Sequence, residues 1–161
     1  MSKKRKTPKS LDRTDRRILE CLQADGRISN VQLARKVNLT PTPCIERVKR
    51  LERQGYIRGY TAVLDPDLVN ASLLVFVEID LSHTSPDAFR RFSEEAKRLP
   101  EIMDCHLVSG NFDYLIKARV KDMKAYRELL GDKILSLPGV YGSRSYVVME
   151  EVKETSNLPL F

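Results

Sequence analysis

Residues 40–58 hold a dense set of side chains that could bind duplex nucleic acid. Guanidinium and ammonium groups bond phosphates, and an arginine can also bond a guanine at two points. The positive end of a helix adds a further attraction for a phosphate. The residues that we expect to contact DNA are Thr40, Thr42, Pro43, Glu46, Arg47, Lys49, Arg50, Arg53 and Arg58.

Position along the helix separates two kinds of contact in this set. Base contacts come from the early part of a helix that enters the major groove, whereas later cations usually hold the backbone. The residues expected near base edges are Thr42, Glu46, Arg47 and Arg50. Those expected near phosphates are Lys49, Arg53 and Arg58. The alternative interpretation is an ordinary solvated helix face.

The distribution of charge favours the nucleic-acid interpretation. Residues 1–60 contain 16 Lys and Arg against six Asp and Glu, a net charge of +10, whereas residues 61–161 contain 12 against 16, a net charge of −4. A basic first third joined to a mildly acidic remainder indicates two modules, one of which faces a polyanion. The basic run Lys3–Lys6 could touch phosphates or could only aid solubility.

Three helices are expected to position these side chains. Asp12 is a plausible N-cap for the first helix, which ends at Asp25-Gly26, and Ser29 caps a second helix that reaches Val37 with Val31 facing inward. Thr40 caps the third helix, with Pro41 in its first position and Gly55 after its end. Two helices joined by a short turn, after a supporting helix, make a helix-turn-helix.

A wing and a linker should follow. Residues 56–64 are expected to form two short strands around Gly59, and the run Asp65-Pro66-Asp67 punctuates the chain. From residue 72 the pattern becomes strand 73–81, helix 86–99, strands 101–108 and 112–120, helix 122–137 and strand 140–152. This order is the split βαβ, or ferredoxin-like, arrangement, so the fold class is α+β.

One face of that sheet should be apolar and unpaired. Both helices cover the same face in this arrangement, and the other face carries Leu74, Phe76 and either Val147 and Met149 or their neighbours. So much exposed apolar surface favours a partner, and we expect a homodimer that packs sheet against sheet. Scattered surface apolar residues are the alternative.

Other chemistry finds little support in the sequence. Cys21, Cys44 and Cys105 are far apart and odd in number, so no disulfide framework or metal-ligand pair is expected, and a reducing cytoplasm fits best. His83 and His106 are isolated, and no phosphate loop, nucleophile elbow or zinc motif is present. We expect no catalytic residue, metal or cofactor, no signal peptide and no membrane span.

Residues 39–57 (LTPTPCIERVKRLERQGYI) resemble the recognition-helix segment of the Lrp/AsnC transcription regulators. The segments DGRISN at 25–30, ASLLVFVE at 71–78, CHLVSG at 105–110, LPGV at 137–140 and YVVMEEVK at 146–153 are similar to the same family. The resemblance runs from about Leu11 to Lys153. It implies bacterial transcription control, dimers that assemble further, often to octamers, and DNA that is wrapped or bent.

The same resemblance implies an amino-acid effector, with leucine as the first candidate, bound between dimers. It places the pocket near the loop after the second strand of the C-terminal domain. Gly110 would let backbone amides approach a carboxylate, and Asp113 could pair with an α-ammonium. The effector-binding residues that we expect are Leu107, Gly110, Asn111, Asp113, Tyr114, Met123 and Tyr146. A plain hairpin turn is the alternative for Gly110-Asn111.

The chain should therefore have five parts. They are a disordered basic tail (1–10), a winged helix-turn-helix (11–64), a linker (65–71), a ferredoxin-like sensing and oligomerisation domain (72–153) and a C-terminal tail (154–161). We expect a cytoplasmic, nucleoid-associated regulator. Two alternatives are an architectural protein that wraps DNA with weak sequence preference and an amino-acid-binding regulatory subunit of an enzyme. The enzyme-subunit alternative does not explain the basic N-terminal module.

Overall fold

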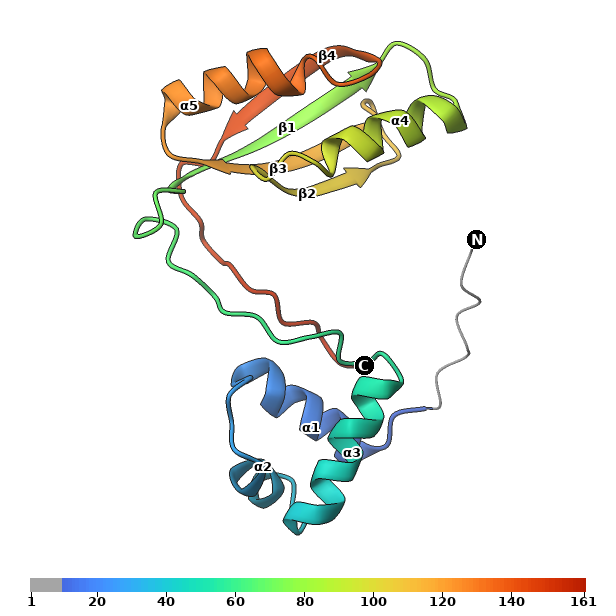
Figure 1. Ribbon diagram of the computed structural model, residues 1–161, viewed down its shortest axis with the longest axis vertical. Coiled ribbons are helices and arrows are strands. Elements are labelled where there is room, and N and C mark those ends of the chain that lie inside the picture. The colour runs from blue at the N-terminus through green and yellow to red at the C-terminus, as the bar shows by residue number, and fades with distance from the viewer. Residues whose placement is uncertain (1–9) are drawn as a thin grey trace. The chain divides into compact units, whose positions relative to one another are not determined.

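The computed structural model describes residues 10–161, and the chain divides into two compact units (Figure 1). Among the described residues, unit 1 comprises 10–63 together with the C-terminal segment 154–161, and unit 2 comprises 64–153. The expected linker over 65–71 thus belongs to unit 2, and the expected tail over 154–161 belongs to unit 1. The basic run Lys3–Lys6 lies outside the described residues.

Unit 1 contains three helices, α1 (Arg13–Ala24), α2 (Asn30–Lys36) and α3 (Pro41–Arg53). Asp12 and Asp15 form a capping box at the start of α1, and Ser29 and Gln32 form another at the start of α2. The α2–α3 turn uses Asn38 at a φ of 56°, in the left-handed region that asparagine tolerates. These signals confirm the three predicted helices and their short turn.

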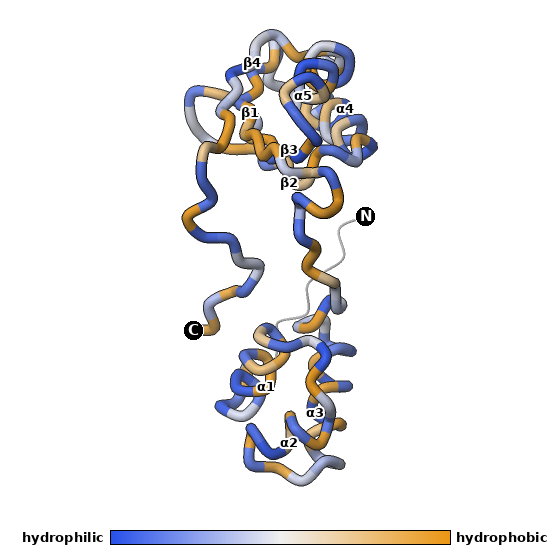
Figure 2. The backbone as a smooth tube through the Cα atoms, turned by 90° about the vertical axis from the view of Figure 1, so that its left-hand side faces the viewer, coloured by the Kyte–Doolittle hydropathy of each residue, from blue (hydrophilic) through white to orange (hydrophobic). Residues whose placement is uncertain are grey.

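The core of unit 1 comes from all three helices. Ile18, Leu33, Cys44 and Leu51 are buried at its centre. Hydropathy alternates along the helices as expected for amphipathic elements (Figure 2). Val31 departs from the prediction: it is 49% exposed, whereas Leu33 and Ala34 of the same helix are buried.

One local prediction for unit 1 is confirmed and one is wrong. Thr40 is the N-cap of α3 and Pro41 its first residue, as predicted, although the Thr40 side chain makes no capping hydrogen bond. Residues 56–64 form no strand, so the expected wing hairpin is absent from this stretch. An isolated two-stranded ribbon has little intrinsic stability. Tyr60 bonds back to Glu52 of α3 at 3.1 Å instead of joining a sheet.

Unit 2 is a four-stranded antiparallel sheet with the order β2-β3-β1-β4. Its strands are β1 (Leu73–Leu81), β2 (Ile102–Leu107), β3 (Tyr114–Val120) and β4 (Val140–Val147). The helices α4 (Pro86–Ala96) and α5 (Met123–Glu128) lie on one face of the sheet (Figures 1 and 2). This topology is the predicted ferredoxin-like arrangement.

Several element bounds in unit 2 are shorter than predicted. Helix α4 ends at Ala96, and β4 ends at Val147 rather than at residue 152. The helix expected over 122–137 changes after Glu128 into a π-helical segment, η1 (Leu129–Ile134), in which the amide of Leu135 bonds the carbonyl of Leu130. The wider turn still buries Leu129 and Ile134 against the sheet.

The core of unit 2 separates the two sheet faces. Val75, Val77 and Ile79 of β1 are fully buried beneath the helices, together with Phe92 and Ile116. The opposite face carries the other set of alternating residues. Phe76 pairs with Tyr146 in the β1–β4 register, and the amide of Val148 donates to the carbonyl of Leu74. Tyr146 and Val148, the neighbours of Val147 and Met149, therefore share this face with Leu74 and Phe76.

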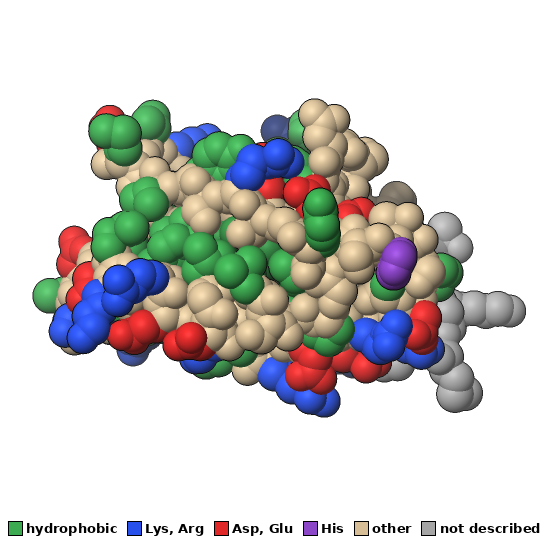
Figure 3. Space-filling view, turned by 90° about the horizontal axis from the view of Figure 1, so that it is seen from above, with side chains coloured by type: hydrophobic (Ala, Val, Ile, Leu, Met, Phe, Trp, Pro, Cys, Tyr) green, Lys and Arg blue, Asp and Glu red, His purple; other side chains and the backbone are tan. Residues whose placement is uncertain are grey.

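Apolar side chains also gather at the surface of this unit. Viewed from above, they form a central group flanked by charged side chains (Figure 3). Tyr141 and Met149 are among the most exposed apolar residues of the described chain, at 83% and 100%. Within residues 10–161, no helix combines the length and the apolar character that a membrane crossing requires.

Candidate nucleic-acid interface

Helix α3 presents a polar face to solvent. Its inner side is set by Cys44 and Leu51, which are buried, with Val48 between them. Because successive residues turn by about 100° around a helix, the side chains pointing most directly away from this core come from the other positions. The residues on that outer face are Thr42, Glu46, Lys49 and Arg53, all of them exposed.

Arg47 lies at the flank of α3 and is already bonded within unit 1. Its guanidinium donates to Asp12 at 2.5 Å and to Asp15 at 2.8 Å, so it joins the recognition helix to the start of α1. The hydrogen bond from Arg47 is the main reason that the pKa of Asp12 lies below its ordinary value. The same bond raises the pKa of Arg47.

Arg50 makes a similar tie one turn later. It donates to the same oxygen of Asp15 at 2.5 Å. Asp15 is only 3% exposed, and a buried carboxylate needs such partners to offset its lost hydration. Arg47 and Arg50 therefore hold the α1–α3 junction in this structure, rather than standing free on the outer face.

The outer face keeps several cations without such constraints. Lys49 has only a loose exposed pair with Glu46, at 3.8 Å. Arg53 and Arg58 are exposed, and Thr40 and Pro43 are exposed at the beginning of the helix. An exposed pair of this kind contributes little stability and is easily exchanged for a phosphate. Cys44 is buried below this face and burial raises its thiol pKa, which fits packing rather than redox chemistry.

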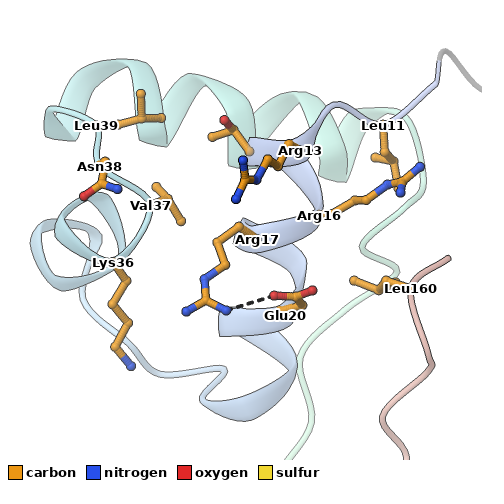
Figure 4. Close-up of a pocket in the computed structure, with 11 residues that line it drawn as sticks. Leu11, Arg13, Arg16, Arg17, Glu20, Lys36, Val37, Asn38, Leu39 and Leu160 are labelled. Atoms are coloured by element: carbon orange, nitrogen blue, oxygen red, sulfur yellow. Dashed lines mark hydrogen bonds and ion pairs between the residues drawn. The ribbon is translucent and has the colours of Figure 1, made fainter.

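A second basic surface lies beside α1. A cavity of about 1100 Å³ is bordered there by Arg13, Arg16 and Arg17 and by Lys36 at the end of α2. Arg17 pairs with Glu20, which also borders the cavity, at 3.1 Å (Figure 4). This surface adds to the positive charge of unit 1 and is distinct from the outer face of α3.

The predicted effector loop is held firmly by its own backbone. The amide of Asp113 donates to Ile79 at 2.9 Å, and the amide of Val108 donates to the carbonyl of Asp113 at 3.0 Å. The carboxylate of Asp113 accepts a 2.7 Å bond from the amide of Leu81. Gly110 and Asn111 are exposed at the tip of the loop, and Leu107 is 55% exposed beside it.

Tyr114 is placed in the core rather than in an open pocket. It is 3% exposed, its hydroxyl lies 3.1 Å from that of Ser93, and it donates to the carbonyl of Phe89. Its ring centre is 4.3 Å from that of Phe92. A residue so occupied serves as a support for the loop.

Met123 and Tyr146 lie away from that loop in the same chain. The loop precedes β3 at the Ile79 end of β1, whereas Met123 follows β3 at the Leu73 end. Six residue steps of roughly 3.3 Å separate these ends, about 20 Å. Tyr146 lies in the middle of the uncovered face and donates to Glu78 at 3.0 Å. The structure thus groups the loop residues and leaves these two apart.

Sequence reasoning missed three contacts near these sites. The pairing of Asp15 with the arginines at positions 47 and 50 was not predicted. Arg119 is buried and binds Glu151 through two bonds of 2.6 and 2.8 Å. Gln23 bonds Leu158 in the C-terminal segment. No sequence pattern connects such distant positions.

Both units match known family models. Residues 11–58 match the model described as winged helix-turn-helix DNA-binding, and residues 74–158 match the Lrp/AsnC ligand binding domain. The chain is 61% identical over 155 residues to the leucine-responsive regulatory proteins of Klebsiella pneumoniae and of Escherichia coli K12. Each alignment covers 96% of this chain and 94% of the relative.

Solved structures agree with this comparison. A transcriptional regulator from Neisseria meningitidis in complex with L-methionine superposes with a TM-score of 0.89 at 39% identity, over 93% of this chain and 97% of that one. An AsnC family transcriptional regulator from Agrobacterium tumefaciens gives a TM-score of 0.88 at 38% identity, over 92% and 97%.

Proposed function

This chain belongs to the Lrp/AsnC family of DNA-binding transcription regulators, and from that premise we propose that it is a dimer that reads an operator with α3 and responds to leucine. DNA binding through the helix-turn-helix and an amino-acid-binding C-terminal domain follow from family membership. The observation that carries the proposed mode of reading is the exposed outer face of α3 on a strongly basic unit.

The outer face of α3 would enter the major groove. Thr42 and Glu46 are exposed in its first half and would approach base edges, while Lys49 and Arg53 follow toward the phosphates. Thr40, Pro43 and Arg58 would lie near the backbone. Arg47 and Arg50 would act in one of two ways. Either they stay bonded to the α1 carboxylates and hold α1 against α3, or they release those carboxylates and bind DNA instead.

Two recognition helices on a dimer would contact successive major grooves, about 34 Å apart, so the operator would be an imperfect palindrome. If six to eight phosphates are neutralised, the logarithm of the affinity should fall with the logarithm of salt concentration with a slope of about −5 to −7. DNA bent between several such sites would add specificity through its shape.

The uncovered face of the sheet supports the dimer. Leu74 and Phe76 of β1 and Tyr146 and Val148 near β4 share that face. Only Leu74 is well shielded within a single chain, so a second copy would cover the rest. Assembly of dimers into a larger ring, such as an octamer, is part of the same proposal.

The effector is proposed from the relatives and from the loop. Two relatives are named for their response to leucine, and a solved neighbour was crystallised with L-methionine, so an apolar L-amino acid is the natural class. The backbone amides near Gly110 would receive the carboxylate. Leu107 and Asn111 would border the site, with Met123 and Tyr146 reaching it only from another copy. We place the regulator in the cytoplasm, on the nucleoid.

The role of Asp113 can be tested separately. Its carboxylate already accepts the amide of Leu81, and an asparagine keeps an acceptor while removing the charge. If Asp113 pairs with the α-ammonium, Asp113→Asn should weaken leucine binding by about tenfold or more, as measured by calorimetry. Unchanged binding with unchanged stability would limit Asp113 to supporting the loop.

A protein that only wraps DNA is the second candidate function, favoured by the basic surface beside α1. Genome-wide occupancy with and without added leucine separates the two. A regulator should occupy discrete sites whose occupancy changes with leucine. Uniform coverage that ignores the amino acid would support the architectural role. Light scattering in the same two conditions reports whether leucine changes the assembly.

A further inference from the structure

The polypeptide passes between the two units twice. It leaves unit 1 after residue 63 and returns to it at residue 154. Segments joined by a single linker are normally free to reorient, and a second connection restricts that freedom. The returning segment, residues 154–161, is named here the C-terminal strap.

Gln23 near the end of α1 binds the backbone of the strap at two points. Its side-chain amide donates to the carbonyl of Leu158 at 3.1 Å, and its side-chain oxygen accepts from the amide of the same residue at 2.7 Å. Gln23 thus pairs with an extended chain as a neighbouring strand would. These two bonds satisfy both the amide and the carbonyl of Leu158, so they fix the position and the orientation of its backbone.

Leu160 adds an apolar anchor two residues later. It is half-buried and packs against the hydrophobic cluster of unit 1, which includes Ile18 and Leu19. Figure 4 shows it beside α1, on the side that carries Glu20. Its neighbours differ sharply: the side chain of Leu158 is 70% exposed and that of Phe161 is 95% exposed. The contact is therefore specific to one side chain of the strap.

Pro159 lowers the entropic cost of this docking. Proline fixes its own φ and disfavours a helical conformation for the residue before it, so Leu158 is held extended even in the free chain. An extended backbone is the form that Gln23 binds. Restricting the undocked state favours the docked one without any added contact.

We infer that the C-terminal strap is a binding partner of the helix-turn-helix within the chain: Gln23 and the apolar cluster that includes Ile18 and Leu19 form its docking site, and the docked strap stabilises α1 and restrains unit 1 through a second connection to the sensor domain. Helix α1 carries Asp15, which holds the recognition helix. The strap thus acts on the same helix that positions the DNA-reading surface.

The inference does not depend on which amino acid is sensed. A three-helix unit of this size buries a small core, so a half-buried leucine and two hydrogen bonds form an appreciable part of its local stability. Undocking of the strap should raise the local opening of α1. It should also leave residues 57–72 as the one remaining connection and make them easier to cleave.

The test uses the full-length protein and hydrogen–deuterium exchange. Leu160→Asp should speed exchange of the α1 amides by about tenfold, the factor expected from losing roughly half of a buried leucine's transfer free energy. Gln23→Ala, which removes the two hydrogen bonds to Leu158, should speed it by about the same factor. Limited proteolysis within residues 57–72 should accelerate by a similar factor. Phe161→Asp and Leu158→Asp are the matched controls, because their side chains are exposed and the backbone bonds to Gln23 remain.

The outcomes are separable from those of DNA binding. If the α1 amides exchange at equal rates, and residues 57–72 are cleaved at equal rates, in Leu160→Asp, Phe161→Asp and the wild type, the proposed docking of the strap is wrong. Faster exchange in all three aspartate variants would also overturn it, because the effect would then be one of charge. DNA affinity is measured in parallel: its absence in the wild type would contradict the proposed function, while the exchange data would still decide the role of the strap.

Discussion

Arg47 on the recognition helix donates a 2.8 Å hydrogen bond to Asp15, a carboxylate buried beneath it in α1. The same carboxylate accepts a bond from Arg50. Two of the four residues expected at base edges thus fix the angle between the supporting helix and the recognition helix. The outer face of α3 is then left to contact the DNA bases, and its orientation depends on these bonds between α1 and α3.

Removing the charge of Asp15 should weaken unit 1. Asp15→Asn leaves two guanidinium groups without their buried anion. Breaking a fully buried pair costs about 3–5 kcal/mol, but here both arginines are partly exposed, so we expect a loss of about 1–3 kcal/mol in the free energy of unfolding. Urea unfolding measures it. Glu20→Gln, which removes an exposed pair with Arg17, is the control and should change stability by less than about 0.5 kcal/mol.

The outer face of α3 should account for much of the salt dependence of DNA binding. Lys49→Ala and Arg53→Ala should each lower the magnitude of the salt slope by about one and weaken binding to operator and scrambled duplexes alike. Fluorescence anisotropy titrations between low and physiological salt give both values. Arg90→Ala, on exposed α4 of unit 2, should leave the slope unchanged. If Lys49→Ala and Arg53→Ala show the same salt slope as Arg90→Ala and the wild type, these two residues do not contact DNA phosphates.

Acid should weaken the α1–α3 junction through Asp12. Its pKa is lowered in the folded protein, chiefly by the hydrogen bond from Arg47. A group with a lowered folded pKa stabilises the protein above its unfolded pKa, about 3.9, and this contribution disappears as the pH falls through the folded value. Asp12→Asn keeps the helix cap, so it should be less stable than the wild type at neutral pH, and the difference should shrink as the pH falls below about 3.9. A constant difference across that range would exclude the ion pair as the cause.

Covering the open sheet face should require a second copy. Phe76→Glu places a charge in the middle of the face that also carries Leu74 and Tyr146. We expect this variant to run as a monomer in light scattering at concentrations where the wild type is a dimer or larger. Arg91→Glu on the helix-covered side is the control. A dimeric Phe76→Glu protein with native circular dichroism would show that the copies associate elsewhere.

Local signals predicted most of the fold. The capping residues Asp12 and Ser29 marked helix starts, and the pattern of residues 73–81 predicted β1 with its observed bounds. Strand and helix ends were less accurate. Strand β4 stops at Val147 although the apolar pattern continues, because strand length is decided by pairing with β1 and not by the residues alone.

The long-range contacts could not be predicted in the same way. Spacing places Arg47 on a helix, but whether it faces solvent or Asp15 depends on how α1 crosses α3. Tyr114 was expected near an effector because of its place beside the loop, and the alternation of β3 instead turns it into the core. The expected wing failed for a related reason: a two-stranded ribbon needs further contacts, and Tyr60 bonds Glu52 instead.

The most direct test of the account compares the affinity of the intact protein for its selected operator with that for a scrambled duplex of equal length, at one physiological salt concentration. A regulator that reads bases with the outer face of α3 should prefer the operator by about 10³-fold or more, and Glu46→Ala should reduce that preference. Equal affinities for the two duplexes, unaffected by Glu46→Ala, would contradict sequence-specific regulation by this chain.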